Sequence, residues 1–141
     1  MFKITRKADF AIRGMFYLGS HLDGRASLDE IAEAEAIPKP FLGKILQALS
    51  KKGLIRSLKG PSGGFMLLRP LDNITLLDVI EAVEGEISLN RCLVEGGGCP
   101  KNGYCAAHTV WMECQEGLIS ILKGHTIRTL VDREQRSKVA Q

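Results

Sequence analysis

The strongest constraint on the fold is a pair of short amphipathic helices separated by a tight turn. Ser27 is expected to cap the first helix, which ends near Glu35. Pro38 and Pro40 open the second helix, where proline is tolerated because the first N–H groups have no intrahelical partner. Apolar residues at helical spacing predict its buried face: Phe41, Leu42, Ile45, Leu46 and Leu49. This order of elements is typical of a helix-turn-helix.

A predicted β-hairpin follows directly. Residues 54–58 and 65–68 are apolar enough to form two short strands, and K-G-P-S-G-G between them is rich in turn-forming residues. A hairpin directly after a helix-turn-helix is a wing. The chain is therefore expected to have a mainly α fold with a small β-hairpin wing.

Charge is distributed unevenly, although the net charge is only +3. Residues 36–71 contain seven Lys and Arg and no acid, whereas residues 72–99 contain six acids and one Arg. A basic face of this kind favours a polyanionic partner, although a solvated surface without a ligand is the alternative. The predicted DNA-binding residues are Lys39, Pro40, Lys44, Gln47, Lys51, Arg56, Lys59 and Ser62. Of these, Lys39, Lys44 and Gln47 have side chains suited to base edges.

Further helices flank this unit. A first helix over residues 6–22, after a Thr5 cap, has a predicted apolar stripe of Phe10, Ala11, Met15, Leu18 and Leu22. A helix after Thr75 is expected to bury Leu76, Val79, Ile80 and Val83. A long helix over residues 105–123 has the stripe Trp111, Cys114, Leu118 and Ile121, with Leu122 alongside, and comes after the winged helix is complete. We interpret it as a dimerisation helix in a homodimer.

The expected organisation has four parts. A winged helix-turn-helix DNA-binding domain spans 1–84, and a cysteine-rich cofactor-binding loop spans 85–108. The dimerisation helix and a short C-terminal helix through Ile127, Leu130 and Val131 span 105–131, and a flexible polar tail spans 132–141. No apolar run is long enough for a bilayer and the N-terminus lacks a signal-peptide core, which predicts a cytoplasmic protein without a membrane partner.

The cysteine-rich loop is the candidate site for chemistry. Cys92, Cys99 and Cys105, with His108, have the spacing C-x6-C-x5-C-x2-H. Structural zinc sites usually have closer pairs, and the wide Gly-rich loop suits an iron–sulfur cluster. A zinc site with three cysteines and a histidine, and a metal-free thiol switch, remain alternatives. Cys114 is about half a turn out of phase with Cys105, so we exclude it as a ligand and expect it to pack in the apolar stripe.

Several motifs resemble those of the bacterial iron–sulfur-cluster regulators, the IscR, NsrR and RirA family. They are K-I-T-R-K-A-D-F-A-I-R, L-D-E-I-A followed by I-P-K-P-F-L, G-P-S-G-G-F, and R-C-L-V-E-G-G-G-C-P-K-N-G-Y-C-A-A-H-T-V-W, and they cover residues 2–131. The resemblance implies a dimeric winged-helix transcription factor, expected to be a repressor, that binds a double-stranded DNA operator and is not an enzyme. The state of its cluster, which responds to cluster status, redox or nitric oxide, is expected to govern DNA binding. A metal-free repressor of the same fold that senses thiols or small molecules is the alternative.

The resemblance also implies the ligands. The two-iron members use three cysteines and a histidine, which correspond to Cys92, Cys99, Cys105 and His108. In the four-iron nitric oxide sensor an aspartate from the partner's first helix completes the site, and Asp9 stands at the matching place. The local C-x-x-H-x-x-W pattern favours His108 and a [2Fe–2S] cluster over Asp9 and a [4Fe–4S] cluster. Gly43 and Lys44 stand where the two-iron regulator has an acidic residue that discriminates between DNA sites, so operator preference does not carry over.

Overall fold

The two helices of the predicted helix-turn-helix are present in the computed structural model, which describes residues 3–141. Helix α2 (Leu28–Glu35) begins with a capping box, in which the Ser27 side chain accepts from the Glu30 N–H and the Glu30 carboxylate accepts from the Ser27 N–H. Ala36 adopts a left-handed conformation (φ 51°) and turns the chain into α3 (Lys39–Lys51). The prediction of both helices is confirmed.

The wing is part of a three-stranded antiparallel sheet. Strands β2 (Ile55–Leu58) and β3 (Gly64–Leu67) form the predicted hairpin. A third strand, β1 (Arg25–Ala26), pairs with the other edge of β3, which gives the order β1-β3-β2. The sequence reasoning missed β1 because two residues are too few to show an alternating pattern.

Helices α1 (Arg6–Ser20) and α4 (Leu76–Glu84) complete the winged helix-turn-helix unit around one hydrophobic core. Thr5 caps α1 and Thr75 caps α4, as predicted. The short 3-10 helix η1 (Leu71–Asn73) joins the sheet to α4. The most deeply buried side chains come from nearly every element of this unit: Met15, Leu18, Ile31, Leu42, Leu46, Leu49, Leu54, Ile55, Ile74 and Val79.

Two predicted core positions were wrong. Leu22 is fully exposed, because α1 ends at Ser20 and the last residue of the stripe falls in the following turn. Phe41 is 63% exposed, because the first turn of α3 lies at the edge of the core. There Phe41 lines an open cleft with Phe10 and Lys44 instead of packing inside.

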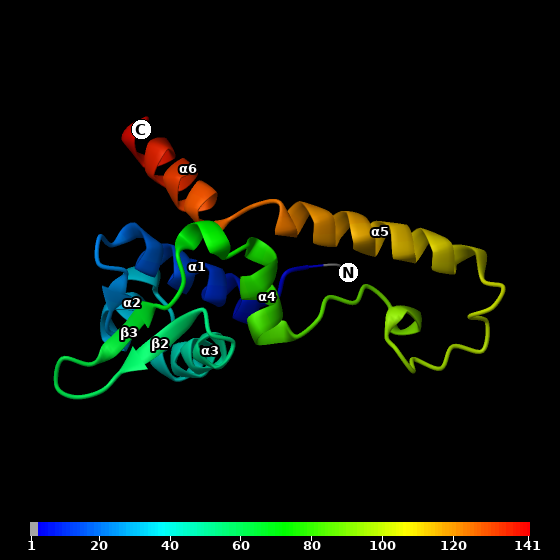
Figure 1. Ribbon diagram of the computed structural model, residues 1–141, viewed down its shortest axis with the longest axis horizontal. Coiled ribbons are helices and arrows are strands. Elements are labelled where there is room, and N and C mark those ends of the chain that lie inside the picture. Colours follow the sequence, from blue (N-terminus) through cyan, green and yellow to red (C-terminus); the bar gives the residue numbers. More distant parts are fainter. Residues whose placement is uncertain (1–2) are drawn as a thin grey trace.

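Helix α5 (Ala106–Lys123) brings the chain back to this unit from the cysteine loop. Figure 1 shows α5 extending from the core, with the cysteine loop at its far end. Only Leu122 of this helix is buried, and Leu118 and Ile119 pack against the core. Cys114 is exposed, so the expectation that it packs in an apolar stripe was wrong for the single subunit.

Helix α6 (Ile127–Val139) begins at a junction with α4. The Leu76 N–H donates to the His125 carbonyl (2.9 Å), and the Ile127 N–H donates to the Ile74 carbonyl (2.8 Å). The helix extends well beyond Val131, so the prediction of a short helix ending near that residue was wrong. Burial of Ile127 and Val131 anchors the first turns, and an i,i+4 pair between Glu134 and Lys138 supports the polar remainder.

None of the helices among residues 3–141 is both long enough and apolar enough to span a membrane.

Candidate metal centre and nucleic-acid interface

The cysteine loop is shaped mainly by its own backbone hydrogen bonds. Asn90 caps the short 3-10 helix η2 (Arg91–Leu93), and the Gly97 N–H then donates to the Val94 carbonyl (2.8 Å). A second turn follows, in which the Cys105 N–H donates to the Lys101 carbonyl (2.9 Å). The Leu89 N–H donates to Gln115 Oε1 (3.0 Å), which ties the start of the loop to α5.

The four cysteines are free thiols in two different environments. Cys92, Cys99 and Cys105 are half-buried in the loop, whereas Cys114 is exposed on α5. Partial burial together with access is the environment expected of ligand or redox thiols. Cys114, which the sequence analysis excluded as a ligand, therefore differs in its surroundings from the three loop cysteines.

His108 has one ring nitrogen without a partner. His108 lies in the first turn of α5, where its backbone N–H donates to the Cys105 carbonyl (3.1 Å). Its Nδ1 is buried and has no hydrogen-bond partner among the residues that the structure describes. A buried polar atom without a partner is costly, and an imidazole nitrogen in that state is available to a metal.

A cavity of about 460 Å³ brings part of the predicted ligand set together. Cys92, His108 and the backbone of Gly96, Gly97 and Gly98 line it, together with Met112 and Gln115 of α5. Cys99 and Cys105 do not line it, and within residues 3–141 no three His, Cys, Asp or Glu side chains lie close enough to hold a metal ion. The donor types and the free Nδ1 fit an iron–sulfur cluster, but the loop must rearrange to present all three thiolates.

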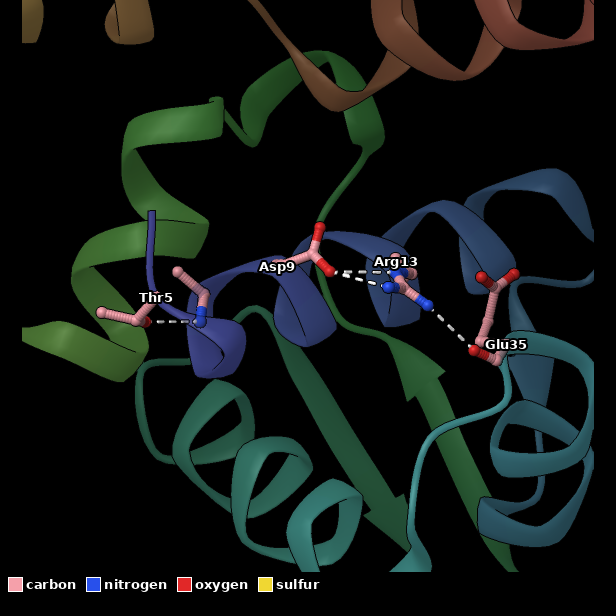
Figure 2. Close-up of polar contacts among 5 residues, drawn as sticks. Thr5, Asp9, Arg13 and Glu35 are labelled. Atoms are coloured by element: carbon pink, nitrogen blue, oxygen red, sulfur yellow. Dashed lines mark hydrogen bonds and ion pairs between the residues drawn. The ribbon is translucent and has the colours of Figure 1, made fainter. Parts of the chain in front are cut away.

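Asp9 has a different set of contacts. Its Oδ2 accepts from Arg13 Nε (3.1 Å) and Arg13 Nη2 (2.8 Å), and Arg13 Nη1 donates to the Glu35 carbonyl (3.0 Å), as Figure 2 shows. Asp9 therefore holds the arginine that donates to a carbonyl at the C-terminal end of α2.

The carboxyl group of Glu35 has an altered acidity. Partial burial raises the pKa of the Glu35 carboxyl, and the nearby Glu134 raises it further.

The predicted DNA-binding residues lie on exposed parts of α3, β2 and the wing. Lys44, Gln47 and Lys51 stand at positions i, i+3 and i+7, so they share the face of α3 opposite its buried leucines. Lys39 and Pro40 lie in the first turn, and Lys39 Nζ pairs with Asp29 (3.1 Å). Arg56 is exposed on β2, and Lys59 and Ser62 are exposed at the wing tip.

One basic side chain near this surface was not predicted. Arg25 of β1 stands directly opposite Met66, which stands opposite Arg56, so Arg25 and Arg56 share one face of the sheet. The Arg25 guanidinium also donates to the Ser62 carbonyl at the wing tip. Only the pairing of β1 with β3 places Arg25 there, and no local sequence signal indicated it.

Comparison with known proteins supports the same fold and class. The sequence matches the Rrf2 family, described as an iron-dependent transcriptional regulator, over residues 4–133. The HTH-type transcriptional regulator IscR of Yersinia pseudotuberculosis is 31% identical over 139 residues, which cover 98% of this chain and 84% of that protein.

Two solved structures are similar over nearly the whole chain. The IscR structure of T. potens has a TM-score of 0.80 and 25% identity, covering 99% of this chain and 93% of that one. The structure of CymR, the global cysteine regulator of B. subtilis, has a TM-score of 0.79 and 26% identity, covering 94% and 98%. The predicted mainly helical winged fold is confirmed, and so is the expectation of a regulator rather than an enzyme.

Proposed function

Because the chain belongs to the Rrf2 family of transcriptional regulators, we propose that its cysteine loop holds an iron–sulfur cluster whose state controls DNA binding. Cys92, Cys99, Cys105 and His108 would hold the cluster, and the [2Fe–2S] form is favoured over [4Fe–4S]. When bound, the cluster would supply iron that responds to oxidants or nitric oxide. The observation that carries this proposal is the buried, unpartnered His108 Nδ1 on a cavity that Cys92 also lines.

The contacts of Asp9 support His108 as the fourth ligand. The Asp9 carboxylate accepts two hydrogen bonds from Arg13 within its own subunit. To ligate a cluster in a second subunit, it would have to loosen this pair and release Arg13 from the end of α2. No such contact has to break for His108 Nδ1.

A path from the loop to the DNA-binding unit exists in the chain itself. The loop begins where α4 ends at Gly85, and α4 packs against α1, α3 and α5. A change in loop conformation would therefore act on the helix that supports the base of α3. We propose that this shift alters the fit of two recognition helices to a palindromic operator.

The exposed apolar side chains of α5 support a homodimer. Val110 and Ile121 are 52% and 63% exposed and lie on one face of a helix that extends beyond the core. Covering such side chains by an equivalent helix is a common way to form a symmetric dimer. Two DNA-binding units would then face two half-sites of one operator.

A metal-free thiol-sensing regulator is the second candidate. Its support is that all three loop cysteines are free and only partly buried, and that a similar structure is described as a global cysteine regulator. In this case, oxidation of the loop thiols would replace cluster chemistry as the signal.

Anaerobic purification followed by iron, zinc and sulfide analysis separates these candidates. We expect iron and acid-labile sulfide in near-equal amounts in the wild-type protein, with visible absorption, and loss of both in Cys92→Ala. Cys114→Ala is the matched control, because Cys114 is exposed on α5 outside the loop. Zinc without sulfide would indicate a structural site, and a metal-free protein with DNA binding sensitive to thiol oxidants would support the second candidate.

The proposed DNA contacts have their own test. Each phosphate contact contributes about −0.9 to the slope of log affinity against log salt, so Lys44→Ala and Lys59→Ala are each expected to reduce its magnitude by about one. Lys123→Ala is the control, because Lys123 ends α5 outside the predicted face. A wild-type slope in either variant removes that lysine from the interface.

A further inference from the structure

The wing tip is a tight turn with little support from its own hairpin. The Gly63 N–H donates to the Gly60 carbonyl (2.9 Å), with Pro61 at the second position of the turn. Gly60 has φ +94°, a conformation that glycine adopts without strain. The flanking strands β2 and β3 have four residues each, and a two-stranded hairpin of this size is only marginally stable alone.

Strand β1 provides the missing support from the other side of the sheet. Arg25 pairs with Met66 of β3, and its side chain donates to the Ser62 carbonyl, 37 residues away in sequence. The Arg25 N–H donates to Asp23 Oδ1 (3.2 Å), which fixes the start of the strand. A single side chain therefore joins the short third strand to the turn that carries the tip.

Close packing beneath the turn makes this connection short and direct. A Cβ at Gly64 would lie 2.6 Å from the Ala26 carbonyl oxygen, so only glycine lets β3 approach β1 at this point. Arg25 itself is exposed and forms no ion pair within the part of the chain that the structure describes. The Arg25 side chain donates to the backbone carbonyl of Ser62.

We propose that Arg25 is a positioning residue for DNA binding, which holds the wing tip so that Lys59 and Ser62 are presented to the DNA in a fixed arrangement. This inference rests on the proposed contact between the wing and DNA. A loop ordered before binding loses less conformational entropy in the complex, so a clamp within the free protein increases affinity without touching DNA.

The competing explanation is that Arg25 contacts a phosphate directly. It shares a sheet face with Arg56, and guanidinium groups bind phosphate well. The two explanations differ in how Arg25 and Lys59 combine. If Arg25 acts through the wing, replacing it no longer changes DNA affinity once the Lys59 contact is removed. If Arg25 and Lys59 contact two phosphates independently, the binding free energies lost in the two variants add.

The first measurement uses the full chain without DNA. Trypsin cleaves after Lys59 in the wing tip, and mass spectrometry follows the appearance of the fragment that ends there. Loss of the clamp in Arg25→Ala is expected to accelerate this cleavage several-fold, about three- to tenfold for the loss of one hydrogen bond. Arg133→Ala, at an exposed position of α6, is expected to leave the rate unchanged. Equal rates in Arg25→Ala and the wild type overturn the clamp.

The second measurement is a double-mutant cycle on DNA affinity. The probe is a duplex that the wild-type protein selects from a random-sequence pool. We expect Arg25→Ala to weaken binding about three- to tenfold in the wild-type background and by no more than about twofold in the Lys59→Ala background. Thermal unfolding of each variant is measured alongside, to verify that the fold is retained.

The outcomes separate the inference from the function on which it rests. If the effects of Arg25→Ala and Lys59→Ala on DNA affinity multiply, and Arg25→Ala lowers the magnitude of the salt slope by about one in both backgrounds, Arg25 contacts DNA directly and the positioning role is overturned. A Lys59→Ala variant with wild-type affinity overturns it as well, because Lys59 then makes no DNA contact for Arg25 to position. Failure of the wild-type protein to select any duplex overturns the proposed function, whereas additive effects in a protein that binds DNA overturn only this inference.

Discussion

Gly97→Ala tests whether the backbone of the cysteine loop is shaped for its cofactor. A Cβ at this position would lie 2.1 Å from the Arg91 carbonyl oxygen and 2.8 Å from the Val94 carbonyl oxygen. Non-bonded heavy atoms in ordinary contact lie about 3.5 Å or more apart. Both neighbours are backbone atoms, which cannot rotate away as a side chain would, so the turn between η2 and Gly97 has to open.

The expected cost follows from this overlap. Inserting a methyl group where it does not fit costs about 1–3 kcal/mol in well-packed structures. If the turn between η2 and Gly97 is kept when the loop rearranges around the cofactor, and the empty loop relaxes to remove the overlap, the affinity for the cofactor falls roughly 5- to 150-fold. The loop contributes no fully buried side chain between residues 86 and 105, so the free energy of global unfolding should change by less than about 0.5 kcal/mol.

The assay is anaerobic reconstitution with iron and sulfide, followed by the rate at which a chelator removes the iron. We expect Gly97→Ala to lose iron faster than the wild type while the thermal unfolding midpoint stays unchanged. Gly103→Ala is the matched control, because a Cβ there meets no atom within 4 Å and Gly103 is not among the glycines with positive φ. Equal rates of iron loss in both variants would refute the reasoning.

Three further predictions concern stability. Ser27→Ala removes the hydrogen bond from the Glu30 N–H to the Ser27 hydroxyl oxygen, whereas the backbone N–H of residue 27 can still donate to the Glu30 carboxylate. This change is expected to lower the free energy of unfolding by about 1 kcal/mol, measured by urea denaturation, and an unchanged midpoint would show that the cap contributes little. Ile127→Ala empties a fully buried position where α6 begins and should cost about 2–5 kcal/mol by the same method, and a loss below that range would mean the site collapses. Because the pKa of Glu35 is raised from its ordinary value of 4.5 in the folded protein, its charged form destabilises the fold at neutral pH, and this penalty disappears as the pH falls through the raised pKa. Glu35→Gln should therefore be more stable than the wild type near pH 7. The difference should shrink as the pH falls through the raised pKa and be absent below about pH 4.5, and equal thermal midpoints at pH 7 would contradict the assignment.

The candidate site was only partly predictable. The C-x6-C-x5-C-x2-H spacing indicated which side chains belong together, because ligand type and order are properties of the sequence. Their positions depend on turns that the loop makes with itself, and the structure places Cys92 and His108, but not Cys99 and Cys105, on one cavity. The Asp9–Arg13 pair is an i,i+4 contact within α1, but the contact of Arg13 with the Glu35 carbonyl appears only when α1 and α2 are packed together.

The sequence by itself determined the elements whose signals are local. Caps at Thr5, Ser27 and Thr75, the helix-turn-helix and the wing hairpin depend on contacts between residues a few positions apart, so spacing and residue type were sufficient. Only the tertiary structure decided the features that need a distant partner. Strand β1 exists because β3 offers an unpaired edge about 40 residues later. In the same way, α6 continues to Val139 because Ile127 and Val131 find buried positions against the rest of the chain, which no local pattern of polar residues could reveal.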